Sequence, residues 1–344
     1  MAGVSSTSAI FKAAVQASKG TPKTAFLCGM MEQHGINVAF DAFDDTAEHG
    51  CRTGVTADRA TVKKTPTRRA GYLVRGSLRG ALYPNLIGVL LRGAGFAKST
   101  SGSTEYTHSF TLAERDALPW LTVLSTLGDR ERRVTDARLS RLTFEAGTQG
   151  IRYTGQLVGT SESDSAGSET STAETLIEIL PSEGALTINY DPDDADTEIF
   201  NSSTDTLNRL TLDIANGLDE ADQSLFRFTR ADFAQQGIDV TGRIEGLEID
   251  YDLYDYIIRG GTSGTGPAPD PGIFSLTWTW ESAILIDTNP YSLTVTIPHA
   301  EMSLDDFAAE GSNVVRWNTM YRMIDQSANP ITIALVNAYA GTLY

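Results

Sequence analysis

The sequence predicts a mainly β protein made of antiparallel β-sandwich or half-barrel units with short packed helices. Three observations support this fold class: many segments alternate apolar and polar residues, a glycine-rich strand pattern recurs, and helical spacing is confined to short stretches. The chain of 344 residues is 41% apolar and holds four Trp, which is enough for a substantial buried core. No apolar run is long enough to cross a membrane.

The glycine-rich pattern places apolar residues at alternate positions between regularly spaced glycines. It reads GYLVRGSLRG at 71–80, GIRYTGQLVG at 150–159 and GIDVTGRIEG at 237–246. With a period of two, Val74, Gly76 and Leu78 share one face of a strand, whereas Arg75 lies on the other. This pattern predicts half-buried antiparallel strands. A glycine on the apolar face indicates a bulge or the close approach of another element.

Two short helices are predicted, each directly after a copy of this pattern. The segment 83–93 has Pro84 near its start and ends in Arg-Gly, as expected from capping preferences and the helix dipole. The segment 250–260 also ends in Arg-Gly, and Asp250 is its predicted N-cap. We also interpret Ser303 as the cap of a further helix, because two Asp residues follow it.

The matched order of strand, glycine-rich strand and helix predicts two similar units that arose by duplication. INVAF at 36–40 is taken as the counterpart of LTLDI at 210–214, and ITIALVNA at 331–338 as the counterpart of the strand at 150–159. The predicted organisation is an N-terminal arm at 1–35, a first unit at 36–160 with a long loop at 41–70, an acidic connector at 161–206 with a hairpin of LIEIL and ALTINY, a second unit at 207–337 and a C-terminal tail at 338–344.

Charge is unevenly distributed along the chain. The net charge is −17, but residues 1–155 hold 20 Lys and Arg against 13 Asp and Glu, so the acidic surplus belongs to the second half. A strongly acidic half disfavours tight binding of nucleic acid, because Lys and Arg supply most of that affinity. Solubility or adaptation to high salt explains the same balance equally well.

The sequence contains no motif for catalysis, a cofactor or a metal site, so we predict a protein that is not an enzyme and needs no cofactor. Cys28, His34, His49 and Cys51 are metal-ligand types, but their spacing fits no common zinc pattern. The acidic run at 191–198 lacks the glycine and the glutamate that a calcium loop of the EF-hand type requires.

Further segments fit one known arrangement. They are HSFTL at 108–112, LPWLTV at 118–123, RLTFEA at 141–146 before the glycine-rich strand, RLTLDIANGLD at 209–219 before another, and the closing ITIALVNAYAGTLY. In this order they resemble the tail tube (major tail) proteins of long-tailed, non-contractile phages of the siphovirus type. The resemblance covers most of residues 36–344 and rests on glycine and apolar spacing.

The resemblance implies a structural virion protein that is made in the host cytoplasm and assembles with itself. Subunits of this family contribute strands to a closed inner barrel, and their rings stack into the tail tube through which genome DNA is delivered. A tape-measure protein and tail terminator and tip proteins are the implied partners. Because the chain carries two tube-like units, three copies would form a pseudo-six-fold ring; a hexamer is the second choice.

DNA must pass such a tube without specific binding, which suggests an acidic lumen that repels phosphate. Glu245 and Glu248, on or near the polar strand face, are the candidate lumen acids. The loop at 41–70 is the candidate for reaching the next ring, and its basic residues are Lys63, Lys64, Arg68 and Arg69.

Two alternatives remain open at this point. A tail terminator or tail-tip ring protein of the same fold would form single rings. A non-viral β-sandwich binding module could use Trp278 and Trp280 as a platform for a ligand. The alternation FSLTWTW puts both rings on the face of Leu276, however, and this indicates core residues.

Overall fold

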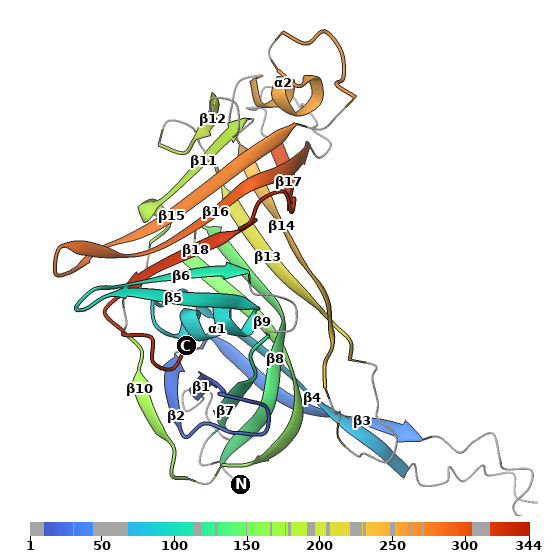
Figure 1. Cartoon of the computed structure of the whole chain (residues 1–344), viewed down its shortest axis with the longest axis vertical. Coiled ribbons are helices and arrows are strands. Elements are labelled where there is room, and N and C mark those ends of the chain that lie inside the picture. Colours follow the sequence, from blue (N-terminus) through green and yellow to red (C-terminus); the bar gives the residue numbers. More distant parts are fainter. Residues whose placement is uncertain are drawn as a thin grey trace, which may run out of the picture.

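The computed structural model describes residues 10–29, 31–43, 68–112, 118–127, 130–148, 150–165, 167–175, 177, 180–190, 197–203, 207–220, 229, 232–247, 252–261, 263–269, 272–304 and 317–344. Within these ranges the chain is mainly β, with two short α-helices, and this confirms the predicted fold class. All eighteen strands are connected through hydrogen-bonded neighbours (Figure 1).

The first half of the chain holds ten strands and one α-helix. They are β1 (Ile10–Val15), β2 (Ala25–Gly29), β3 (Gln33–Phe43), β4 (Arg68–Ala81), α1 (Leu86–Gly93), β5 (Phe96–Gly102), β6 (Tyr106–Leu112), β7 (Leu121–Leu127), β8 (Arg130–Gly147), β9 (Gly150–Asp164) and β10 (Thr170–Ala173).

The second half holds the remaining strands, a 3₁₀ turn and the second α-helix. They are η4 (Pro181–Glu183), β11 (Gly184–Tyr190), β12 (Thr197–Asn201), β13 (Arg209–Leu218), β14 (Gln235–Leu247), α2 (Asp252–Arg259), β15 (Ile273–Ile286), β16 (Asn289–Leu304), β17 (Trp317–Met323) and β18 (Thr332–Asn337).

The strands form two packed layers. The front sheet has the order β3-β4-β9-β8-β13-β14-β17. The back sheet has the order β12-β11-β15-β16-β18-β6-β5. The two are continuous because β16 also pairs with β17. The first part of β8 extends a third group, β7-β1-β2-β10, in which only the β2–β10 pairing is parallel.

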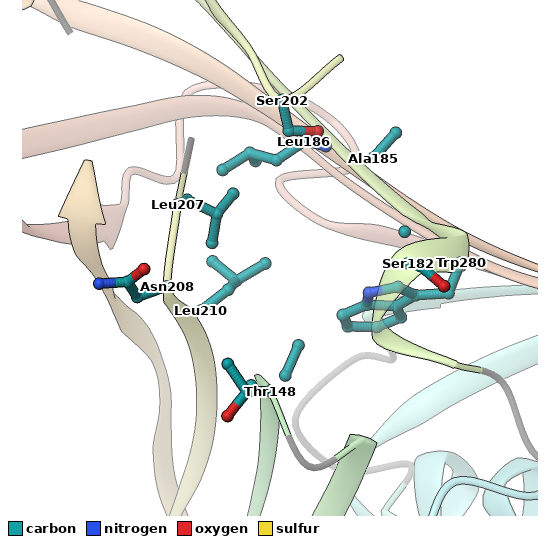
Figure 2. A pocket seen from close by; sticks show the side chains of 12 residues that line it. Thr148, Ser182, Ala185, Leu186, Ser202, Leu207, Asn208, Leu210 and Trp280 are labelled. Atoms are coloured by element: carbon teal, nitrogen blue, oxygen red, sulfur yellow. Dashed lines mark hydrogen bonds between the residues drawn. The ribbon is translucent and has the colours of Figure 1, made fainter. Parts of the chain in front are cut away.

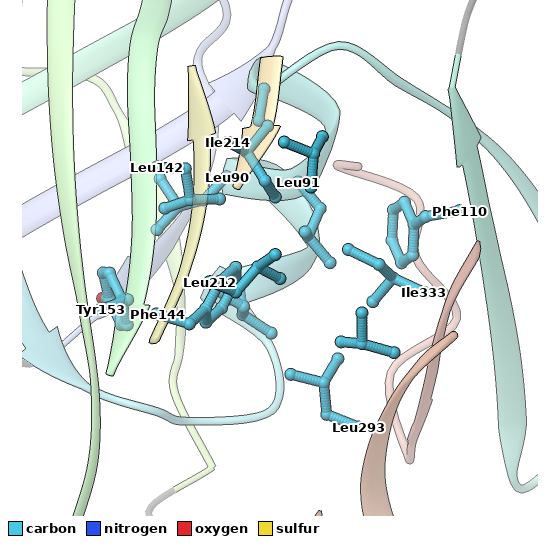
Figure 3. Close-up of a cluster of buried hydrophobic side chains, with 14 of the residues drawn as sticks. Leu90, Leu91, Phe110, Leu142, Phe144, Tyr153, Leu212, Ile214, Leu293 and Ile333 are labelled. Atoms are coloured by element: carbon cyan, nitrogen blue, oxygen red, sulfur yellow. The ribbon is translucent and has the colours of Figure 1, made fainter. Parts of the chain in front are cut away.

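Helix α1 lies in the core between the two sheets. Figure 3 shows Leu90 and Leu91 of α1 between Leu142 on β8 and Phe110 and Ile333 on β6 and β18. All residues of α1 except Arg92 are buried. Since each buried Leu or Ile side chain stabilises the fold by about 1.5–3 kcal/mol, this helix anchors one layer to the other.

A distant carboxylate completes the start of α1. Asn85 makes no side-chain cap; instead Glu174 accepts hydrogen bonds from the backbone N–H groups of Asn85 at 2.8 Å and Leu86 at 2.7 Å. These are two of the donors that a helix N-terminus leaves unsatisfied. Burial raises the pKa of Glu174 to about 7, against the opposing effect of these hydrogen bonds. The two short helices predicted after the glycine-rich strands are confirmed, whereas Asp250, the predicted N-cap of the second, lies outside the described residues.

Several segments take other positions than the sequence suggested. The described part of the predicted N-terminal arm supplies β1 and β2, whose Phe11 and Phe26 are buried. ALTINY belongs to β11, which pairs with β12 and β15, whereas most of LIEIL lies outside the described residues. Ser303 caps no helix; it lies in β16 opposite Met320. The face with Trp278 is buried in the core, as predicted.

Candidate functional site

The most distinctive surface is the polar face of the front sheet, on the side away from the core. Alternation along the strands sends apolar residues inward and places arginines, acids and threonines outward. The register aligns them in rows: Arg152 lies opposite Glu145, Glu145 opposite Thr211, and Thr211 opposite Arg243. Sequence positions almost 100 residues apart therefore form one continuous surface.

In the part of the chain that the structure describes, seven solvent-accessible arginines lie on this face. They are Arg75 and Arg79 on β4, Arg152 on β9, Arg141 on β8, Arg209 on β13, Arg243 on β14 and Arg322 on β17. Each has a carboxylate oxygen within 3.6 Å. The acids are Glu32, Glu145, Asp213, Glu220, Asp239 and Glu245, and Glu301 lies opposite Arg322 in the register.

The closest of these contacts joins the two halves of the chain. Arg141 Nε on β8 donates to Asp213 Oδ1 on β13 over 2.6 Å, and Thr143 Oγ1 donates to the same oxygen over 2.7 Å. This hydrogen bond raises the pKa of Arg141. A similar chain runs from Glu145 through Arg209, at 2.9 Å, to Glu245, at 3.7 Å. The face is thus a network of cross-strand ion pairs.

Two concave features lie at one end of the front sheet. One, of about 580 Å³, is charged and is lined by Arg79, Arg152, Arg209, Glu145 and Glu245 among others. The other, of about 360 Å³, opens between the sheets and is shown in Figure 2. Its lining has no charged, His or Cys side chain: Ala146, Gly147, Thr148, Ser182, Gly184, Ala185, Leu186, Ser202, Leu207, Asn208, Leu210 and Trp280. This apolar opening therefore offers no acid or base for chemistry.

The recurring glycines have a packing role in the front sheet. A Cβ atom on Gly76 would lie 2.7 Å from Leu157 of β9, and one on Gly242 would lie 2.0 Å from the hydroxyl of Tyr321 on β17. Each glycine lies directly opposite that larger residue in the register. The predicted close approach of another element is confirmed at both positions.

The two hairpins that contain these glycines have the same register. Ile36 lies opposite Gly76 in β3–β4, and Leu212 lies opposite Gly242 in β13–β14. The counterpart of INVAF is therefore shifted by two residues from the predicted LTLDI alignment. In addition, β17 rather than β18 takes the place beside β14 that β9 has beside β4.

One strand pairing connects the part of the front sheet that contains the β3–β4 hairpin to the part that contains the β13–β14 hairpin. We call these two parts the hairpin groups, and we call the β8–β13 pairing between them the joint. Residues 141–146 of β8 pair with residues 210–215 of β13, in antiparallel orientation. At the far end of the front sheet, β3 pairs with β4 alone among the described strands. The carbonyl of Ile36 accepts a hydrogen bond from Arg132 Nη1 at 2.9 Å, which shows that this side of β3 faces away from β4.

The β3–β4 hairpin projects beyond its neighbour β9. The β4–β9 pairing starts at Val74, whereas β3 and β4 remain paired as far as Phe43 and Arg68. Figure 1 shows this hairpin extending away from the body of the molecule.

The predicted site residues are only partly within the described structure. Glu245 lies on the polar face and is ion-paired with Arg209 and Arg243. Arg68 and Arg69 begin β4. The others, Glu248, Lys63 and Lys64, lie outside the described residues, as do His49 and Cys51.

No group of three metal-ligating side chains occurs in the part of the chain that the structure describes. His34 Nδ1 lies 2.9 Å from Ser125 Oγ, and burial raises the pKa of the Cys28 thiol. Sequence reasoning missed most of the arginines' partners, because all of these arginines except Arg243 pair with an acid from a distant segment; only the alternation of polar residues indicated their face.

None of the helices within the described ranges is long and apolar enough to span a membrane.

Comparison with known proteins identifies the family. No curated protein matches the sequence. The phage tail tube protein family matches residues 53–312, well over half of the chain, and this range includes β4, the β13–β14 hairpin and the β8–β13 pairing. The chain therefore belongs to the phage tail tube protein family, whose members are structural proteins of the virion tail.

Proposed function

We propose that this protein closes into rings that stack into the tube of a non-contractile, siphovirus-type tail, and that genome DNA passes through it. The observation that carries the proposal is the β8–β13 joint. It links two hairpin groups that share one register around Gly76 and Gly242. A chain that already joins two such groups edge to edge can repeat the same joint with the next copy, which removes the open edges of the sheet.

In this arrangement the β3 edge receives the next subunit. Three copies, each with two hairpin groups, would complete a pseudo-six-fold ring, and six copies would be needed only if each chain supplied one group. Before assembly, the hydrogen bond from Arg132 to the carbonyl of Ile36 occupies an acceptor on the open edge of β3, which protects this edge from pairing with other strands. The polar face of the front sheet would then line the channel, and the back sheet would form the outside.

The projecting β3–β4 hairpin supports a contact between rings. The segment 44–67 between its strands, together with Arg68 and Arg69, would reach the neighbouring ring in the stack, and Lys63 and Lys64 belong to that segment. Deleting residues 44–67 should leave rings that no longer stack. Normal tubes from this variant would refute the role.

Negative-stain electron microscopy of the purified chain, across concentration and salt, tests the function. Hollow tubes or stacked rings support it, and top views distinguish three chains from six. Single rings that never stack would indicate a terminator or tail-tip protein. Monomers under every condition, including after addition of tail-tip and tape-measure proteins, would refute ring formation.

A proline on β3 tests the joint itself. Val38 lies two residues from Ile36, so its N–H also faces away from β4. Val38→Pro would remove a donor from the outer edge while leaving the β3–β4 pairing in place. Loss of rings from a folded variant is the expected result; rings of normal size would place the joint elsewhere. Ala39→Pro, which removes a donor that faces β4, is the control for damage to the hairpin.

A further inference from the structure

The charge on the polar face of the front sheet differs from that of the chain as a whole. Among the described residues, its seven arginines are balanced by the six acids that pair with them together with Glu301, which lies on β16 opposite Arg322, whereas the whole chain carries −17. The acidic surplus therefore resides on other residues. A channel wall formed by this face would be balanced, not acidic.

The arginines of this face have the properties of a phosphate-binding surface. They lie on neighbouring strands, with spacings of about 5 Å between strands and about 7 Å between alternate residues of one strand. Guanidinium groups at such spacing can contact successive phosphates of DNA, which gives strong, salt-dependent binding. A tube that bound DNA in this way would hold its genome instead of releasing it.

We propose that the acids of this face mask the arginines, so that DNA can slide over a surface that would otherwise bind it. The masking is local: Glu145 and Glu245 neutralise Arg209 and Arg243, and Asp239 neutralises Arg322. The inference deepens the proposed function, because it takes this face as the one that DNA meets.

Stability alone is a weak reason for so many pairs. Ion pairs between exposed side chains contribute about 0–1 kcal/mol each, and salt screens them further. Arg322 and Asp239 are 68% and 56% exposed, so their pair belongs to this class. If the pairs served only the fold, removing the acids would lower stability slightly, and it would change the affinity for DNA no more than the same change in net charge elsewhere on the chain.

The decisive variant removes three accessible acids and leaves Asp213, which also accepts a hydrogen bond from Thr143, in place. In Glu145→Gln/Asp239→Asn/Glu245→Gln, Arg209, Arg243 and Arg322 lose the carboxylates with which they form ion pairs. The control, Glu162→Gln/Asp164→Asn/Asp255→Asn, makes the same change in net charge. It removes partners of Arg132 and Arg130, which lie on the first part of β8 where that strand pairs with β7, and of Arg259, which lies on α2.

The assay is fluorescence anisotropy of a short labelled DNA duplex with the unassembled full-length chain, between 50 and 200 mM salt. The face variant should bind at least tenfold more tightly than the wild type at 50 mM salt. Its log–log salt slope should be steeper by about 3, since each neutralised phosphate adds about 0.9. Adding Arg209→Gln, Arg243→Gln and Arg322→Gln to it should abolish this gain.

Equal binding by the face variant and the control would overturn the proposal, because it would show an effect of net charge alone. Unchanged binding by a folded face variant would also overturn it, and the double variant Glu145→Gln/Glu245→Gln serves if the triple variant does not fold. Microscopy of the wild type separates the two ideas. If the wild type forms tubes but the face variant does not bind DNA more tightly, the proposed function stands and the masking is refuted. If the face variant binds DNA more tightly but the wild type forms no tubes, the masking stands and the proposed function is refuted.

Discussion

The packing role of the recurring glycines can be tested at Gly242. A methyl group there would lie 2.0 Å from the hydroxyl oxygen of Tyr321 and 2.2 Å from the carbonyl oxygen of Thr211. Tyr321 is buried, and its hydroxyl donates to that same carbonyl over 2.6 Å. Gly242→Ala therefore has to displace a large side chain from a filled core position and break its hydrogen bond.

The expected cost follows from these two effects. Overpacking of a core costs about 1–3 kcal/mol, and a buried hydroxyl without its partner costs about 1–3 kcal/mol more. We expect Gly242→Ala to lower the free energy of unfolding by about 3–5 kcal/mol. Gly237, in the same sequence pattern, has no atom within 4 Å of its Cβ position. Gly237→Ala should be neutral or stabilising by about 0.4–1 kcal/mol.

Urea unfolding of the unassembled chain measures both variants. Trp278 reports the site directly, because its ring lies 5.7 Å from that of Tyr321. Combining Gly242→Ala with Tyr321→Leu should recover at least about 1 kcal/mol relative to the sum of the single effects. The interpretation fails if Gly242→Ala and Gly237→Ala unfold at the same urea concentration, since the space opposite Gly242 would then not be filled.

Two further predictions concern the surroundings of α1. Burial raises the pKa of Glu174 to about 7, above its unfolded value of about 4.5, so its contribution to stability is full below pH 4.5 and is lost as the pH rises through 7. Thermal unfolding should show a loss on the order of 2–3 kcal/mol between pH 5 and 8, and Glu174→Gln should abolish this dependence; an unchanged slope in the variant would contradict it. Tyr344 packs against Gly88 and bonds to Asn337 over 2.8 Å, so Tyr344→Ala should cost about 3–5 kcal/mol and Tyr344→Phe about 1 kcal/mol. Equal melting temperatures for these two variants would show that the ring contributes no packing.

The sequence predicted which face of a strand is buried better than it predicted which strands are neighbours. Period-two alternation identified the buried face of β14, where Val240 and Ile244 are inaccessible, and the face of β15 with Trp278. Alternation fixes which residues of a strand point inward, but it says nothing about which strand lies next to it. The sequence therefore predicts β18 as the counterpart of β9, whereas in the structure β17 holds this place.

The candidate site was predictable only in outline. Arg75 and Glu245 were expected on polar faces, and both are there. Their partners could not be predicted, because Arg75 bonds to Glu220 and Arg141 to Asp213, which are 145 and 72 positions away. Such pairs depend on the β8–β13 joint and on the path of the chain after β13, which no local pattern encodes.

Residues from both proposed units pack in one core. The late strand β18 pairs with the early strand β6, where Ile333 lies opposite Phe110, and both side chains pack around α1. The ring of Tyr344, the last residue of the sequence, packs against Gly88 of that helix. Because the two halves share one core in this way, the β8–β13 joint between them has a fixed geometry. If the ring forms as proposed, every second joint is therefore already made when the chain folds, and only the remaining joints depend on concentration.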